Sequence, residues 1–258
     1  MLKKTLNFIL LIISFFTFGQ SKHTLLFDNG KVKEEGQFDT NGLKTGLWTD
    51  YWNNGNISNI GNYVENKLYG KYKQYYESNG QLWHEKEYDE NERLTNIWKS
   101  YWENGNLKNI GSFKDGNKIG VWKLFHNNGQ LYEIGTYVND KEVGEFKTYY
   151  DNGKLIQQVK YDNGIIVGEW ISYHENGNIW EEKKYENGKL SGEKKEYYKN
   201  GKLKEIGNVK SGWAEGEWKE FYESNGKIKS IGSYKNGEMI GEWKYYDEIG
   251  KLMNTETY

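Results

Sequence analysis

The chain has 258 residues, a formal net charge of −2, 31 glycines, no cysteine and no proline. The lack of cysteine excludes a disulfide framework and thiolate chemistry, and the lack of any basic block argues against nucleic acid as a partner. Aromatic residues make up 17% of the chain although its mean hydropathy is −0.97. The apolar surface therefore belongs mainly to Tyr and Trp, which can cover other groups while keeping a polar tip in water.

Residues 1–19 have the form of a signal peptide. Lys3 and Lys4 make a short basic start, and the apolar run over 6–18 is too short for a comfortable membrane span. The small residue Gly19 predicts cleavage after it, with the next bond as the second choice. An uncleaved anchor is the alternative. We therefore expect an exported protein, in the periplasm, the cell envelope or outside the cell, with no integral membrane span after cleavage.

Residues 20–258 are predicted to form one repeat domain of about nine units. A glycine followed two residues later by an aromatic ring recurs with a step of 24 residues, as at Gly120, Gly144 and Gly168. Asn96 and Gly192 begin two degenerate copies. A turn signal recurs with the same period, as Asn-Gly at 29–30, 54–55, 79–80, 104–105, 128–129, 152–153, 176–177, 200–201 and 225–226 and as Ile-Gly at 249–250.

Each unit predicts a β-hairpin. The first strand is expected to begin at the anchor glycine and to end at an aromatic pair, and Asn-Gly then favours a two-residue type I′ turn. The second strand leads to a looser turn before the next anchor, as at Asn163-Gly164. The predicted fold is all-β, an elongated array of antiparallel hairpins of about 24 residues that forms a twisted single-layer sheet.

The side-chain spacing predicts which residues share a face. In the unit after Gly129, the aliphatic Leu131 and the aromatic Tyr137 are an even number of residues apart, so without a bulge they share one face. Gly135 lies between them, and a glycine inside a strand usually marks a close approach. We expect a ring to cover each such glycine, supplied by the anchor aromatics Trp48, Trp122, Trp170, Trp218 and Trp243.

The adjacent aromatic pairs put a ring on each face of the sheet, because neighbouring strand residues point in opposite directions. The second member of each pair varies among Trp, Tyr and His, which suggests a wetter or more specialised row. Exposed aromatic rows can bind partners, although packing alone also explains them. The candidate binding surface is this row: Trp52, Tyr76, Trp102, His126, Tyr150, His174, Tyr198, Tyr222 and Tyr246.

The pattern G-x-W-x-x-Y-Y-x-x-N-G-K-L-x-x-x-G-x-Y resembles the MORN repeat, and more closely its bacterial variant form. It is nearly complete over 216–234 and 120–137, and the resemblance covers about residues 27–258. It implies elongated hairpin arrays that serve as scaffolds and in protein or membrane association. Many bacterial members carry the label of a YwqK-type toxin–antitoxin system antitoxin, which implies an immunity-like role.

The sequence does not predict an active site, a metal site or a cofactor. His126 and His174 lie two units apart in equivalent positions, too far apart to share a metal, so they are expected to replace other aromatic residues. Glu181-Glu182 is expected to be a solvated pair whose side chains point apart. Gly153-Lys154 belongs to a hairpin turn and lacks the helix that a phosphate-binding loop requires. We therefore expect a protein that is not an enzyme.

Three functions remain open. A protein-interaction scaffold, with a protein partner, agrees best with an elongated repeat surface. A glycan or cell-surface binder that uses the aromatic rows is the second alternative. Membrane-lipid association, which the family resemblance implies, is the third, and the negative net charge argues against anionic lipid.

Overall fold

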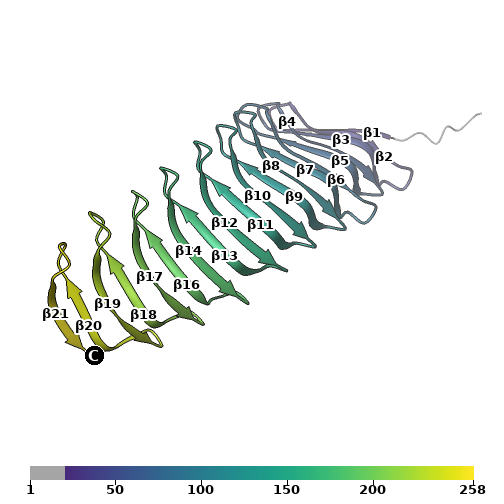
Figure 1. Cartoon of the computed structure of the whole chain (residues 1–258). Helices are drawn as coiled ribbons and strands as arrows, with labels where there is room; N and C mark the ends of the chain where they lie inside the picture. The colour runs from purple at the N-terminus through teal and green to yellow at the C-terminus, as the bar shows by residue number, and fades with distance from the viewer. Residues whose placement is uncertain (1–20) are drawn as a thin grey trace, which may run out of the picture.

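The computed structural model describes residues 21–258, and they form one sheet of 21 strands. Consecutive strands pair antiparallel along the chain, so the sheet is an open meander that extends from β1 at one end to β21 at the other (Figure 1). The predicted all-β hairpin array is confirmed. The predicted signal peptide lies outside the described residues, and within 21–258 no helix could cross a membrane.

The strands of the first half are β1 Ser21–Leu26, β2 Val32–Phe38, β3 Lys44–Tyr51, β4 Ile57–Val64, β5 Lys67–Tyr75, β6 Leu82–Tyr88, β7 Leu94–Tyr101, β8 Leu107–Lys114, β9 Asn117–Phe125 and β10 Leu131–Val138. Those of the second half are β11 Lys141–Tyr149, β12 Leu155–Asp162, β13 Ile165–Tyr173, β14 Ile179–Glu186, β15 Lys189–Leu190, β16 Gly192–Tyr197, β17 Leu203–Lys210, β18 Trp213–Phe221, β19 Ile228–Lys235, β20 Glu238–Tyr246 and β21 Leu252–Thr257. β14 pairs with both β15 and β16, so these two short segments together take the place of one strand.

The Asn-Gly turns that follow the aromatic pairs line one edge of the sheet, which we call the asparagine edge. In the turn after β3, the Trp52 N–H donates to the carbonyl of Asn56 and the Gly55 N–H donates to the carbonyl of Trp52. Gly55 is left-handed with φ 93°, whereas Asn54 is not. This is a three-residue loop, the type I turn with a glycine bulge, so the predicted two-residue type I′ turn is wrong here.

Most turns of the opposite edge are of type I′, whereas the loops after β2 and β6 are three-residue loops in which the Asp39 and Asp89 N–H groups donate to the carbonyls of Leu43 and Arg93. Asn163 and Gly164 have φ 51° and 83°, and they connect the directly paired residues Asp162 and Ile165. Apart from those two loops, the turns predicted to be looser are therefore the tight ones. Both kinds of loop use Asn-Gly, but only the type I′ turn needs a left-handed asparagine.

The sequence predicts that the anchor glycines begin the first strands, but only Gly192 does so, at the start of β16, and the others lie inside their strands. Gly144 is the fourth residue of β11 and has φ 74°. The register of β10 against β11 shifts beside it, between Ile134 and Thr136, so the anchor marks a β-bulge. Asn96 replaces glycine at one anchor and adopts φ 57°, because asparagine tolerates the left-handed region better than most residues.

The pairing register separates the two faces. Trp122 lies opposite Gly135, and both side-chain positions belong to what we call the ring face, the face that carries the anchor rings. Phe125 pairs with Leu131 on the other face, which we call the tyrosine face because it carries the first member of each aromatic pair. A bulge between Leu131 and Glu133 breaks the alternation, so Leu131 and Gly135 lie on opposite faces. The prediction that they share one face is therefore wrong.

The core is a layer of side chains on the ring face. All six buried hydrophobic residues within 21–258 belong to it: Trp48, Trp122, Phe146, Val159, Val209 and Trp243. Lysine side chains cover this layer, with Lys44 Nζ 3.8 Å from the Trp48 ring and Lys118 Nζ 4.6 Å from the Trp122 ring. The ammonium groups lie over the ring faces, and that of Lys44 also pairs with Glu34 at 3.1 Å, so these side chains shield rings that a single sheet would otherwise expose.

Candidate binding face

The anchor rings cover the strand glycines of the preceding hairpins, as predicted. A Cβ added to Gly36, Gly111, Gly135, Gly207 or Gly232 would lie closer than 3.0 Å to a neighbouring ring. The covering rings are Trp48, Trp122, Phe146, Trp218 and Trp243. Trp170 departs from the prediction because it lies opposite Val159, where no glycine is present.

The rings also contact one another along the ring face. Phe113 and Trp122 have centroids 5.1 Å apart in an edge-to-face arrangement, and Tyr137 and Phe146 follow at 5.4 Å. Such pairs stabilise packing beyond the area they bury. This stack continues to Tyr161 and resumes at Trp218, Tyr234 and Trp243.

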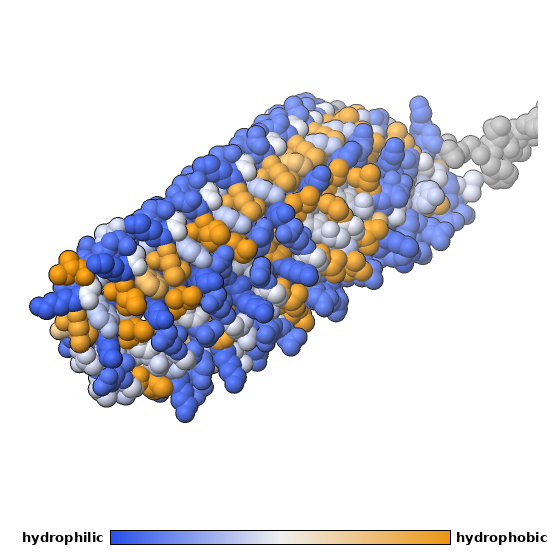
Figure 2. Space-filling view, viewed as in Figure 1, coloured by the Kyte–Doolittle hydropathy of each residue, from blue (hydrophilic) through white to orange (hydrophobic). Residues whose placement is uncertain are grey.

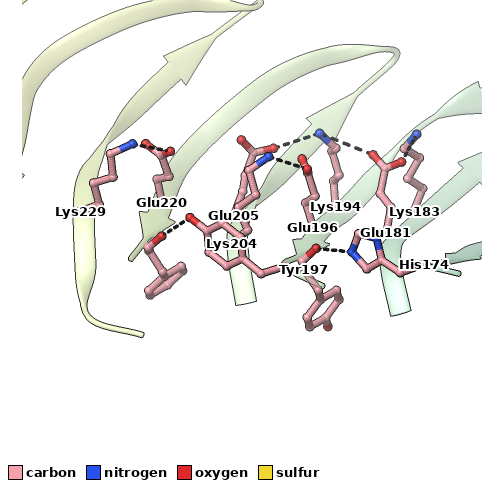
Figure 3. Close-up of polar contacts among 12 residues, drawn as sticks. His174, Glu181, Lys183, Lys194, Glu196, Tyr197, Lys204, Glu205, Glu220 and Lys229 are labelled. Carbon is pink, nitrogen blue, oxygen red and sulfur yellow. Dashed lines mark hydrogen bonds and ion pairs between the residues drawn. The ribbon is translucent and has the colours of Figure 1, made fainter. Parts of the chain in front are cut away.

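A charged segment interrupts the stack between those two stretches (Figure 3). Lys194 occupies the anchor-ring position of its unit, and Lys183 occupies the glycine position of the preceding hairpin. Lys183 lies 2.6 Å from Glu181, and Lys194 lies 2.9 Å from Glu205 and 3.6 Å from Glu181. Desolvation opposes protonation of Lys194, but the hydrogen bond and charge of Glu205 outweigh it and raise the Lys194 pKa. The segment replaces ring packing with paired charges.

Glu181 and Glu182 point to opposite faces, as predicted, but only one of them is solvated surface. Glu181 is 8% exposed and lies in the charged segment of the ring face. Glu182 accepts a hydrogen bond of 2.8 Å from the Tyr197 hydroxyl on the tyrosine face. The prediction that both are solvated is therefore wrong for Glu181, because two lysines replace the glycine and the ring that would otherwise surround it.

The candidate row forms a ladder of hydrogen bonds between consecutive hairpins. Each side-chain tip reaches the carbonyl of the first member of the aromatic pair in the next unit. The distances are 3.2 Å for Trp52, 2.8 Å for Tyr76, 3.1 Å for Trp102, 2.8 Å for His126, 3.4 Å for Tyr150, 2.9 Å for His174, 2.8 Å for Tyr198 and 2.6 Å for Tyr222.

Tyr246 does not belong to this row. It pairs with Leu252, as Phe125 pairs with Leu131, so it lies on the tyrosine face as a first member. Asp247 takes the row position, since its N–H and carbonyl close the last three-residue loop. In β20, the first strand of the last hairpin, the aromatic pair lies one residue closer to the anchor glycine than in the other units. Two neighbouring rings alone do not reveal this shift.

The ladder explains the residue choice in the row. Trp, Tyr and His each offer a ring with an N–H or O–H at its tip, and phenylalanine does not. Phenylalanine does occur among the first members, at Phe125 and Phe221, which have no such bond to make. His126 and His174 thus replace other aromatic residues, as the sequence predicts, and they contact the carbonyls of Tyr149 and Tyr197.

A second ladder runs along the asparagine edge. Asn104 Oδ1 accepts the N–H of Asn106 at 3.0 Å within its own loop, and Asn104 Nδ2 donates to the Asn127 carbonyl of the next loop at 2.9 Å. The Asn54, Asn79, Asn128, Asn176 and Asn225 side chains make the same bond to the next loop. The turn asparagines therefore hold the loops in a fixed order as well as closing them.

Three exposed rings lie beside the row, and the sequence reasoning missed them. They are Trp83, Tyr132 and Trp180, with relative exposures of 39%, 39% and 45%. Each follows the aliphatic residue at a strand bulge and contacts the row, at 5.6 Å to Tyr76, 5.0 Å to His126 and 6.0 Å to His174. The signal that could have found them is an aromatic residue three positions after the turn glycine.

His84 has a strongly shifted pKa. Its ring lies 4.4 Å from Trp83 and 5.5 Å from Trp98, and its Nδ1 atom is buried without a hydrogen-bond partner. Burial lowers the His84 pKa from 6.5 to about 4, and Lys86 and Lys108 add to the effect. The imidazole is therefore neutral near pH 7. Within residues 21–258 no three His, Cys, Asp or Glu side chains are grouped to hold a metal ion.

Comparison with solved structures gives matches of low similarity. The structures titled "Crystal Structure of TcdB2-TccC3" and "Crystal Structure of TcdB2-TccC3-Cdc42" match with TM-scores of 0.24 and 0.23 and with 11% and 10% identity. Each match covers 88% of this chain, which spans 15% and 14% of the two matched chains. No curated protein matches.

The model of the family described as "MORN repeat variant" matches residues 44–65, 94–115, 118–139, 142–163, 166–187, 190–211, 214–236 and 239–258. The boundaries coincide with single hairpins, since 118–139 holds β9, its three-residue loop and β10. The hairpins β1–β2 and β5–β6 lie outside the matches yet pair in the same sheet. The eight matches cover more than half of the sequence, and the chain belongs to the MORN repeat variant family.

Proposed function

We propose that this chain is an exported, non-catalytic repeat scaffold that binds a partner protein along its asparagine edge. The supporting observation is the set of exposed rings, Trp83, Tyr132 and Trp180, each beside a member of the aromatic row. The row itself is tied to backbone carbonyls and so holds these rings in place. Exposed aromatic side chains in a polar surround are typical of protein-binding surfaces.

The distribution of apolar groups supports binding at separate points along the array. On the face shown in Figure 2, apolar side chains are interspersed with hydrophilic ones. The ladders of the row and of the asparagine loops fix the spacing between hairpins. A fixed array of this kind presents a partner with repeated contacts, each weak on its own. An immunity-like role, which the family resemblance implies, is one form of such binding.

Partner capture from envelope extracts tests the proposal. A triple variant changes Trp83, Tyr132 and Trp180 to Lys, the residue that other hairpins carry in that position as Lys33, Lys108, Lys204 and Lys229. The control triple variant changes Val64, Val138 and Ile165 to Lys, at exposed sites of the opposite edge. We expect a protein that the wild type and the control capture and the ring variant loses.

Loss in the control variant instead, or capture of no protein at all, would contradict the proposal. The export part is tested separately by fractionating cells that express the full chain and sequencing the N-terminus of the product. We expect the mature chain in the envelope or medium, beginning at Gln20. A cytosolic product that keeps Met1 would exclude export.

A further inference from the structure

Two loops on the asparagine edge have the same sequence but differ in their surroundings. Both are four-residue loops, Glu-Ser-Asn-Gly at 77–80 and at 223–226. In both, the serine hydroxyl bonds a glutamate of the next unit, Ser78 to Glu103 at 3.1 Å and Ser224 to Glu248 at 2.9 Å. Each loop borders an open hollow, of ≈ 450 Å³ in the first case and ≈ 600 Å³ in the second. The chain thus contains two versions of one site.

The second hollow is lined by two lysines. Lys202 Nζ lies 3.1 Å and 2.6 Å from the carbonyl oxygens of Glu223 and Ser224, and Lys229 lies beside the row residue Tyr222. The two lysines therefore line the same hollow as Glu223 and Glu248, and Lys229 Nζ pairs with Glu220 at 2.9 Å.

The first hollow has the carboxylates without the cations. Glu77 and Glu103 line it together with the rings of Trp52, Tyr76 and Trp83, and none of the described residues that line it is basic. Trp83 stands where the second site has Lys229, and Asn56 stands where that site has Lys202. Aromatic rings beside two carboxylates favour a ligand that has an apolar stem and a positively charged end.

The next unit shows that a row ring accepts such a group. Lys108 occupies the position equivalent to Trp83, and its Nζ lies 4.2 Å from the centroid of the Trp102 ring. Lys33 Nζ likewise lies 5.9 Å from the Phe27 ring, whereas Lys204 and Lys229 pair with carboxylates of their own hairpins. We propose that the hollow at Trp52, Tyr76 and Trp83 binds a lysine side chain of the partner protein, its stem on the rings and its ammonium group between Glu77 and Glu103.

This inference rests on the proposed function and names what the partner presents. The probe is Nα-acetyl-lysine N-methylamide, titrated into the full chain while the indole N–H signals of Trp52 and Trp83 are followed by NMR. The uncharged control ligand is Nα-acetyl-norleucine N-methylamide. We expect saturable shifts of both indole signals with the lysine probe in the millimolar range, and none with norleucine.

Three variants sharpen the test. Trp83→Lys supplies the amine internally, so the Trp52 signal should no longer respond, and the lysines of other hairpins in this position indicate that the fold will persist. Glu103→Gln should weaken binding about threefold or more. The double variant Lys202→Asn/Lys229→Trp should give the second hollow the chemistry of the first and add a second binding site.

Equal shifts with norleucine or with a cello-oligosaccharide would overturn the inference in favour of an apolar or a glycan site. An unchanged response of Trp52 in Trp83→Lys would also overturn it. If the lysine probe fails while partner capture still depends on the exposed rings, only the ligand assignment is wrong. If capture fails while the probe binds, the proposed function is wrong and the amine site stands.

Discussion

Trp122 lies across Gly111 of the preceding hairpin, so close that a Cβ on Gly111 would fall within 3.0 Å of the indole. The atoms concerned belong to the fused part of the ring system, not to the end of a flexible chain. The same relationship recurs at Gly36, Gly135, Gly207 and Gly232, where it joins one hairpin to the next. Because a single sheet has no second layer, these contacts between units supply much of its core.

Gly111→Ala should therefore destabilise the fold by about 1–3 kcal/mol, the usual cost of adding a group to a packed core. The measurement is the free energy of unfolding in urea, followed by tryptophan fluorescence. Ser112→Ala is the control, since Ser112 is the next residue of the same strand and faces the other way. An equal effect of the two substitutions would show that the ring does not constrain the glycine.

Tyr198→Phe should cost about 0.5–1.5 kcal/mol, because it removes only the hydroxyl that donates to the Phe221 carbonyl at 2.8 Å. Tyr149→Phe makes the same change in a first member of an aromatic pair, where phenylalanine occurs naturally, and should have almost no effect. Urea unfolding of the two variants compares them directly. If Tyr198→Phe proves neutral, the row does not stabilise the array through its tips.

The step of 24 residues, the hairpins and the rings over glycine could all be predicted from sequence. A repeat shows its own period, and a strand glycine beside a recurring tryptophan leaves a space that only a ring fills. The bulge after Leu131 could not be predicted, because an inserted residue has no fixed sequence signature. That bulge decides which face carries Leu131 and places Tyr132 where it is exposed.

The turn types and the charged segment escaped prediction for other reasons. Asn-Gly suits both a type I′ turn and the type I turn with a glycine bulge, and only the pairing of the flanking residues distinguishes the two. In the sequence, Lys194 is only a lysine in place of the anchor ring. Its partners Glu181 and Glu205 lie in the two neighbouring strands, so the local sequence does not show that these charges are paired. The row residues other than Tyr246 were identified from the sequence, but their tips contact the next hairpin.

Substitution by glycine should have opposite effects on stability in the two turn types. Glu65 has φ 51° in a two-residue turn, so Glu65→Gly should stabilise the fold by about 0.5–1 kcal/mol. Asn104 makes hydrogen bonds within its loop and to the next loop, so Asn104→Gly should destabilise it by about 1 kcal/mol or more. Thermal unfolding of both variants checks the signs. Stabilisation by Asn104→Gly would mean that the asparagine edge carries type I′ turns after all.

His84 predicts a stability change in mildly acidic solution. Its folded-state pKa of about 4 lies below the ordinary 6.5, so the unfolded chain takes up the proton first as the pH falls. Stability should therefore decline from about pH 6.5 toward pH 4. His84→Phe keeps a ring between Trp83 and Trp98 and should flatten the decline in that interval, measured as the urea midpoint against pH. If stability declines equally steeply in the variant, groups other than His84 cause the decline.

Site-specific photo-crosslinking tests the central claim, that a partner binds along the asparagine edge, most directly. A photoreactive phenylalanine analogue is placed at Ser78, beside the hollow of Tyr76 and Trp83, or at Val138, which is exposed on the opposite edge. We expect irradiation in envelope extract to join one discrete protein to the Ser78 variant and none to the Val138 variant. Crosslinking from Val138 alone, or from neither position, would contradict the account.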